Sequence, residues 1–169
     1  MDSKNNFLEG ESKKAYDKAI VFLTRNDRTE HEVREKLSKS GYSESITQAV
    51  IDKLLEYGYV DDEDYAKRYL EHLIGKGKGR FSVRESMIRK GLPSELVTFT
   101  IEDEYSKELE YEIAEKIALT VLSGLDENED KAKVSAKINR RLMGRGFAYD
   151  VISDVMNEIR NQIEGMKNV

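Results

Sequence analysis

A glycine that recurs three times in the same apolar surroundings is the feature that most constrains this chain. The three copies are centred on Gly41, Gly91 and Gly146. Apolar residues stand eight and four positions before each glycine, and one, five and ten positions after it. In that order they are Val33, Val83 and Ile138; Leu37, Met87 and Leu142; Tyr42, Leu92 and Phe147; Ile46, Leu96 and Val151; and Ile51, Ile101 and Met156. Self-similarity of this kind is typical of a repeat protein.

Each copy predicts a helix, a glycine turn and a second helix. The residues before each glycine are apolar every three or four positions, as on one face of an α-helix. A glycine directly after the last turn is typical of a left-handed C-cap, and the apolar residue that follows it folds back onto the helix end. Capping signals mark the expected helix starts: Thr29 with Glu32, Ser82 with Glu85, Ser43, and Ser94.

A further amphipathic helix is expected before each pair, over residues 15–25, 62–76 and 111–122, the second of them capped by Asp61 or Asp62. The repeating unit is therefore a three-helix module of about 50 residues, which is marginal alone and needs its neighbours to cover its apolar faces. We expect an all-α fold of tandem modules that form an elongated, curved rod, right- or left-handed.

The expected organisation has five parts. Residues 1–13 form a polar N-terminal segment, residues 14–60, 61–106 and 107–163 form the three repeats, and residues 164–169 form a tail. The acidic stretch 123–130 is the best candidate for a loop, and the boundary between the second and third repeats falls within residues 104–108.

Several kinds of chemistry are disfavoured by the residues present. The chain has no cysteine, and its two histidines lie in different modules. The run "GKGKG" at residues 75–79 lacks the rest of a phosphate-loop or dinucleotide motif and follows a helix instead of a strand. The acids at 61–64 stand where a helix N-terminus favours negative charge. We therefore predict a non-enzyme without cofactor, metal or small-molecule substrate.

No stretch is long and apolar enough for a membrane span, and the N-terminus is unlike a signal peptide. We expect a cytoplasmic protein that does not bind membranes.

Charge is segregated along the chain, although the net charge is −5. Residues 66–91 and 131–146 are basic, whereas residues 95–115 between them are acidic. Such segregation indicates an electrostatically selective surface for a partner. The candidate contacts on the helices before the glycines are Lys76, Lys78, Arg80, Arg84, Arg89 and Lys90 in the second module, and Lys133, Lys137, Arg140 and Arg141 on one helical face in the third.

The segment around Gly41 could also belong to a helix-turn-helix protein that reads DNA. Two observations count against it. A further helix follows "GYV" at residues 58–60, where a winged helix needs a hairpin. The helices after the three glycines are net acidic and would repel phosphate. Direct DNA binding and a helical scaffold for another protein stay open as alternatives.

Two stretches resemble the RecX family of regulatory proteins. They are "GYVDDEDYAKRYLEHLIGKGKGRFSVRESMIRKGL" at residues 58–92 and "RRLMGRGFAYDVISDVM" at residues 140–156. The shared pattern is a glycine–aromatic pair, an acidic helix start, an aromatic–Ala pair, a Gly-Lys-Gly turn, a basic helix ending in Lys-Gly, and a final Arg-Gly-Phe. The resemblance covers about residues 14–160, and its order and spacing are fairly specific.

The resemblance implies a protein that lies in the groove of the RecA recombinase filament. Such a protein modulates, and usually inhibits, the ATPase and strand exchange of RecA, in recombination, DNA repair and the SOS response. Weak binding to single- or double-stranded DNA is compatible with it. By motif position, the resemblance implies partner contacts at Arg68, Lys78, Arg80, Arg84, Arg140 and Arg145. It implies structural roles for Asp62, Tyr65, Ala66, Gly79, Gly91, Gly146 and Phe147, to which the repeat alignment adds Gly41.

Overall fold

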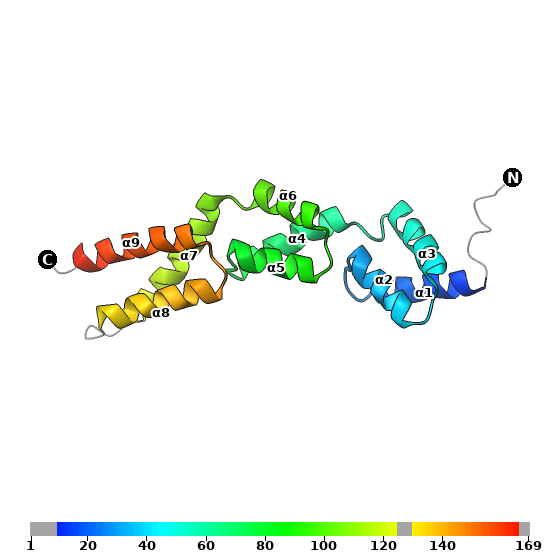
Figure 1. The fold of residues 1–169 in the computed structure, drawn as a ribbon, viewed down its shortest axis with the longest axis horizontal. Coiled ribbons are helices and arrows are strands. Elements are labelled where there is room, and N and C mark those ends of the chain that lie inside the picture. The colour runs from blue at the N-terminus through cyan, green and yellow to red at the C-terminus, as the bar shows by residue number, and fades with distance from the viewer. Residues whose placement is uncertain (1–9, 125–129, 166–169) are drawn as a thin grey trace. The chain divides into compact units, whose positions relative to one another are not determined.

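The computed structural model describes residues 10–124 and 130–165, with side chains up to residue 161. These residues are helical throughout apart from turns, which confirms the predicted all-α class (Figure 1). The helices are α1 (Glu11–Leu23), α2 (Glu30–Lys39), α3 (Glu44–Glu56), α4 (Asp62–Gly75), α5 (Arg80–Arg89), α6 (Ser94–Glu104), α7 (Lys107–Leu122), α8 (Lys131–Gly144) and α9 (Tyr149–Gly165). Of the predicted N-terminal segment 1–13, the loop 123–130 and the tail 164–169, residues 1–9, 125–129 and 166–169 lie outside the described residues.

The three repeat glycines end helices in the left-handed conformation, as expected. Their φ angles are 87° at Gly41, 80° at Gly91 and 76° at Gly146. At the first of them, the N–H groups of Gly41 and Tyr42 donate to the carbonyls of Ser38 and Leu37. This pair of bonds is the Schellman motif, and it satisfies carbonyls that a helix end otherwise leaves without a partner.

The predicted helix starts are partly confirmed. Thr29 and Glu32 form a capping box at α2, Ser43 caps α3, and the Asp61 carboxylate accepts from the N–H of Asp64 at α4. The box predicted at Ser82 is wrong, because α5 already begins at Arg80. Its first N–H groups find acceptors elsewhere in the fold, so that no local box is needed. Ser94 is the first helical residue of α6.

The described helices follow one another in three successive triplets, but their contacts divide the chain into two compact units. The first unit comprises residues 1–68 and 88–96, and the second comprises residues 69–87 and 97–169. The division therefore runs through α4, α5 and α6. The boundaries of the three repeats, and the rod that they are expected to form, stay predictions.

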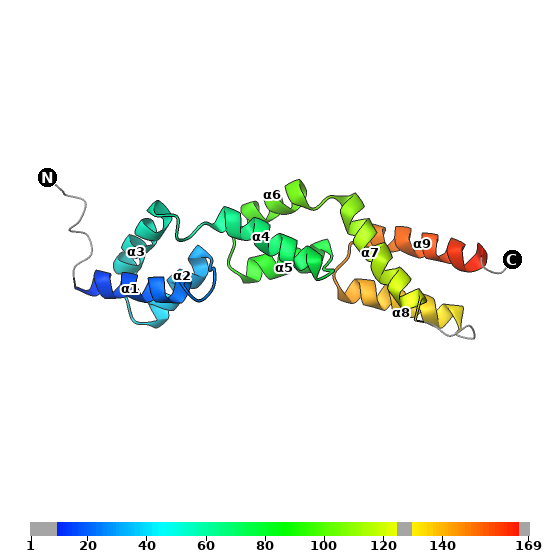
Figure 2. The ribbon, with the colours of Figure 1, turned by 180° about the vertical axis from the view of Figure 1, so that it is seen from behind.

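Each unit has an apolar core of its own. In the first, α1, α2 and α3 pack pairwise around Val33, Leu37 and Ile51. In the second, α7 packs against α8 and α9 (Figures 1 and 2), and the core includes the fully buried Ile138 and Leu142. The apolar positions eight and four residues before each glycine are fully buried in all three copies. The repeated pattern therefore marks core positions, as expected.

None of the helices in the described ranges combines the length and the apolar character needed to cross a membrane.

Candidate partner-binding surface

In the first unit, the start of α2 is held by residues from the next triplet. The Thr29 hydroxyl donates to the carbonyl of Lys90 at 2.7 Å, and the N–H of Glu30 donates to the Asp62 carboxylate at 2.9 Å. The Lys90 ammonium pairs with Glu32 at 2.9 Å, and this hydrogen bond raises the pKa of Lys90. A polar clasp thus joins the first helix pair to the end of α5.

In the second unit, the start of α5 is held in the same way. The N–H of Gly79 donates to the carbonyl of Arg145 at 2.9 Å, and the N–H of Phe81 donates to the carbonyl of Gly146 at 2.9 Å. The N–H of Arg80 donates to the Glu110 carboxylate at 2.9 Å. Glu110 is only 1% exposed, and it also accepts from the N–H of Ala148 at 3.2 Å. Its buried charge is therefore stabilised by hydrogen bonds from two backbone groups.

The two clasps use the same repeat positions. Thr29 and Gly79 each stand twelve residues before a repeat glycine, and Lys90 and Arg145 each stand one residue before the next. The contact between them is a side-chain bond in the first unit and a backbone bond in the second. This explains why position 79 is glycine, since an added Cβ would lie 2.3 Å from the backbone of Phe147.

The residues expected to be structural take part in these clasps and in the cores. Tyr65, Ala66 and Phe147 are buried. A Cβ on Gly91 would lie 2.2 Å from the His31 ring, and one on Gly146 would lie 2.3 Å from the Ser82 hydroxyl. Partial burial raises the pKa of the Asp62 carboxyl, with smaller contributions from nearby acids, against the hydrogen bond from the N–H of Glu30.

Several of the basic residues proposed as partner contacts bind within the chain. Arg145 donates to the carbonyls of Lys76 and Gly77 at 2.9 and 3.1 Å. Arg84 donates to the hydroxyl of Thr98, and Arg68 pairs with Asp27 and Asp64. Arg80 pairs with Glu110 at 3.4 Å and donates to the carbonyl of Tyr105. Lys76 is exposed, Lys78 is half-buried, and Arg89 is exposed but has a partner.

The basic residues of α8 differ from these. Lys133, Lys137, Arg140 and Arg141 are all exposed, whereas Val134, Ile138 and Leu142 on the other face are buried, as their spacing predicts. Within residues 10–124 and 130–165, the four basic side chains have no ion-pair or hydrogen-bond partner. Residues 131–146 include no acid. The structure therefore brings four basic side chains without such a partner together on one face of α8.

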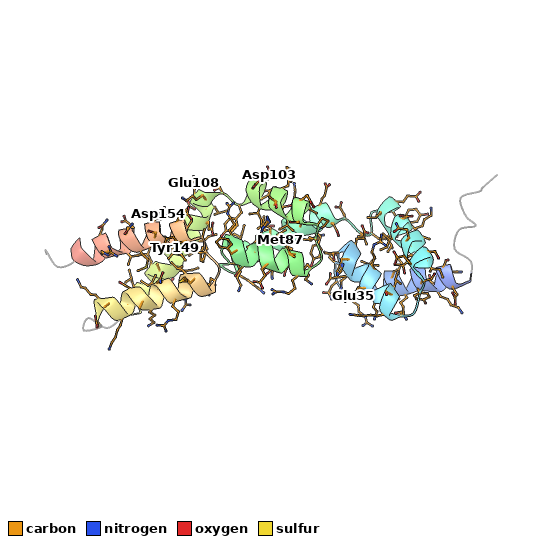
Figure 3. All side chains as sticks on the ribbon, in the orientation of Figure 1. Glu35, Met87, Asp103, Glu108, Tyr149 and Asp154 are labelled. Atoms are coloured by element: carbon orange, nitrogen blue, oxygen red, sulfur yellow. The ribbon has the colours of Figure 1, made fainter. Side chains whose placement is uncertain are left out.

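A groove beside this face was missed by sequence reasoning. It lies between α8 and α9 and has a volume of about 340 Å³. Neutral polar residues line both walls, namely Ser135 and Asn139 on α8, and Ser153 and Asn157 on α9. Tyr149 stands at the start of α9 with 82% of its surface exposed (Figure 3). In the sequence, only an aromatic residue at the expected start of a helix, Tyr149, could have indicated this groove.

The acids of α9 face a different neighbour. Asp150 and Asp154 lie 2.6 and 4.0 Å from the ammonium of Lys107 on α7, and this pairing lowers the pKa of Asp150. Burial raises the pKa of Tyr111, also on α7, and the nearby carboxylates of Glu115, Glu158 and Asp154 raise it further. The acids that make α9 net negative therefore do not line the groove. Among the residues that line it, Arg160 carries charge.

The described residues contain no group of three or more histidine, aspartate and glutamate side chains that could hold a metal ion. Fold and surface together define an all-helical repeat protein with polar clasps between its triplets and an exposed basic helix. Chemistry of this kind suits contact with a macromolecule.

Comparison with known proteins gives the family. The family model for the first three-helix domain of RecX matches residues 15–54. "Regulatory protein RecX" of Vibrio vulnificus strain CMCP6 is 31% identical over 68% of this chain and 74% of the relative. The chain belongs to the RecX family.

Other relatives are longer, and solved structures share the fold. "Regulatory protein RecX" of Clostridium botulinum strain Eklund 17B is 38% identical, and the match spans 69% of this chain and 54% of the relative. The crystal structure of RecX from Lactobacillus salivarius superposes with a TM-score of 0.80 at 23% identity, over 89% of this chain and 97% of that one.

Proposed function

We propose that this protein binds the filament of a RecA-type recombinase in the cytoplasm and lowers its ATPase and strand-exchange activity. In this way it acts in recombination, DNA repair and the SOS response. Membership in a family whose members are named regulatory proteins is the observation that carries the proposal. The absence of cysteine and the isolated histidines fit a regulator that works by binding.

We assign the main contact to the basic face of α8. Arg145, Arg84, Arg80 and Lys90 hold internal bonds that partner binding would have to break. Lys133, Lys137, Arg140 and Arg141 have no such bonds among the described residues. Exposed charges of one sign steer association with an oppositely charged surface and raise its rate. The acidic target is either the recombinase or the DNA that it holds.

The DNA-stimulated ATPase of RecA measures this function directly. The wild-type protein should lower the rate at amounts up to equimolar with RecA. The double variant Lys137→Glu with Arg140→Glu should lose most of the inhibition, because it replaces attraction with repulsion. Lys13→Glu with Lys14→Glu on α1 changes the net charge equally at exposed positions outside the proposed surface and should inhibit like the wild type.

Two results would contradict the proposal. If the wild-type protein changes neither the ATPase rate nor strand exchange, the family function does not apply to this chain. If both double variants inhibit equally, the basic face of α8 is not the contact. The alternative of a scaffold for another protein is tested by affinity capture from a strain that lacks RecA.

A further inference from the structure

We propose that two copies of this chain bind each other through the start of α1 and the turn at Gly41. This goes beyond the proposed function, because the contact joins two copies of the chain and requires no recombinase. It assigns a partner to three groups of the first triplet, the Glu11 carboxylate, the Ser40 carbonyl and the backbone of Gly41, which we call the open acceptor surface.

A carboxylate recurs at one repeat position of the three triplets. Glu11, Asp62 and Glu110 each stand four residues before a fully buried alanine, namely Ala15, Ala66 and Ala114. In the two clasps, the Asp62 and Glu110 carboxylates each accept from the N–H of the first residue of a helix, α2 or α5, at 2.9 Å. An acid at this position therefore binds a helix start wherever the preceding triplet supplies one.

The same acid of the first triplet has no partner. Glu11 is exposed and makes no hydrogen bond or ion pair within residues 10–124 and 130–165. The Ser40 carbonyl stands at the position where the carbonyls of Lys90 and Arg145 accept in the clasps, one residue before a repeat glycine. No donor for it lies in the described part of the chain. Both acceptors of a clasp are thus present and unused.

The repeat glycine of the first triplet is open in the same way. A Cβ on Gly91 would meet the His31 ring, and one on Gly146 would meet the Ser82 side chain, because a helix start of the preceding triplet covers each glycine. A Cβ on Gly41 would have no atom within 4 Å. The described residues therefore leave uncovered, in the first triplet, a surface that binds a helix start twice elsewhere in the chain.

The start of α1 supplies donors of the kind that this surface binds. Side chains cap the starts of α2, α3, α7 and α8, whereas Gly10 at the start of α1 has no side chain to do so. No side chain of the described ranges accepts from the first N–H groups of α1 in its place. These N–H groups and the helix dipole together attract a carboxylate. Because Glu11 belongs to the same turn, donors and acceptors of two copies can satisfy each other about a two-fold axis.

The third triplet shows why a two-fold contact is favoured over head-to-tail growth. The helices α2 and α5 begin eleven residues before a repeat glycine, but α8 begins fifteen residues before one, at Lys131. The Asp130 side chain caps its start, and the N–H of Val134, at the donor position of the clasps, bonds to the Asp130 carbonyl. This helix therefore offers no donors to the open acceptor surface of a further copy, and association ends at a closed dimer.

Sedimentation velocity of the full chain, without recombinase, tests the proposal. A contact of a few hydrogen bonds is weak, so the series of protein concentrations has to reach about 1 mM. Along this series the wild type should shift from the mass of a monomer toward that of a dimer. Glu11→Ala should weaken dimerisation about 10- to 150-fold, from about 1.5–3 kcal/mol per hydrogen bond to a charged group at about 1.4 kcal/mol per tenfold. Glu63→Ala removes an exposed acid from the first turn of α4 and should dimerise like the wild type.

Amide hydrogen exchange locates the contact. Raising the protein concentration should slow exchange at residues 11–13 and leave α8 unchanged. Three results would overturn the proposal: a wild type that stays monomeric at every concentration, equal dimerisation of Glu11→Ala and wild type, or slowed exchange only outside the start of α1. A chain that dimerises only after residues 2–9 are deleted would also overturn it, because that segment would then cover the surface. None of these results bears on the RecA assay, so the two proposals fail separately.

Discussion

Single residues show most clearly what the repeat motif requires. Gly79 has an ordinary φ angle, and its neighbour in space, not its own backbone, excludes a side chain. Gly75, four residues earlier in the same glycine-rich run, has no atom within 4 Å of the position of an added Cβ. Two glycines of one motif therefore have different structural roles.

Replacing each of these glycines by alanine separates the roles. Gly79→Ala places a methyl group against backbone that cannot move freely, so it should destabilise the fold by about 3 kcal/mol, the upper end of overpacking costs. Gly75→Ala adds helix propensity in open space and should be neutral or stabilising by up to about 1 kcal/mol. Urea unfolding followed by circular dichroism measures both. Equal midpoints for the two variants would contradict the clasp at Gly79.

Asp62 makes a prediction about pH. Its pKa is raised in the folded state, so folding favours the protonated carboxyl, and the ionised form costs stability. The stability that the protonated carboxyl contributes is fully present below the pKa of Asp62 in the unfolded chain. It is lost as the pH rises through the raised pKa of the folded state. Asn at this position keeps an oxygen to accept from the N–H of Glu30. Asp62→Asn should therefore unfold at a higher urea concentration than the wild type at neutral pH.

The advantage of Asp62→Asn should shrink as the pH falls toward 3.8, where the wild-type carboxyl becomes protonated as well. Unfolding midpoints of both proteins across this range measure it. A variant that is less stable than the wild type by the same amount at every pH would show that desolvation of Asp62 is unimportant.

At the scale of helices, the hydrogen bonds that satisfy the helix ends decide which basic residues remain available to a partner. The sequence predicted a capping box at Ser82, but α5 starts earlier. The N–H groups of Arg80 and Phe81 donate to Glu110 and Gly146, and the N–H of Gly79, just before the helix, donates to Arg145. Those acceptors lie more than 25 residues away in the sequence, so local signals could not reveal them. Arg145, a predicted partner contact, is part of the same arrangement.

Arg145 and Arg141 provide a matched test on neighbouring turns. Arg145→Ala leaves the carbonyls of Lys76 and Gly77 without their charged donor and should cost about 1.5–3 kcal/mol of stability. Arg141→Ala removes an exposed side chain and should stay within about 0.5 kcal/mol of the wild type. Thermal unfolding distinguishes them. If Arg145→Ala is as stable as Arg141→Ala, the bonds from its guanidinium contribute nothing, and partner contact becomes its better explanation.

At the scale of the whole molecule, the two cores are composed of different triplets. Leu37 belongs to the core of α1–α3, and Ile138 belongs to that of α7–α9. Cutting either side chain to alanine should cost about 2–5 kcal/mol, because both are fully buried. Leu37→Ala should speed amide hydrogen exchange in α1–α3 and leave α7–α9 unchanged, and Ile138→Ala should do the reverse. Equal acceleration in both regions would show a single cooperative unit.

The sequence alone determined the class of the fold and most of its helix ends. Apolar spacing predicts helices whatever lies around them, and a glycine after the last turn meets a local steric demand, so Gly41, Gly91 and Gly146 adopt the expected conformation. The exposed face of α8 also followed from spacing, since residues three and four apart share a helix face.

Only the tertiary structure decided which charges are available. The sequence does not distinguish the basic residues of α8 from Lys90, Arg80 and Arg145. In the structure, carboxylates and carbonyls that are distant in the sequence bind these three side chains. In the sequence, the acids of α9 counted against contact with nucleic acid. In the structure, Lys107 of α7 pairs with two of them, Asp150 and Asp154. Helix formation depends on neighbours along the chain, whereas the pairing of a charge depends on neighbours in space, and residues far apart in the sequence supply those.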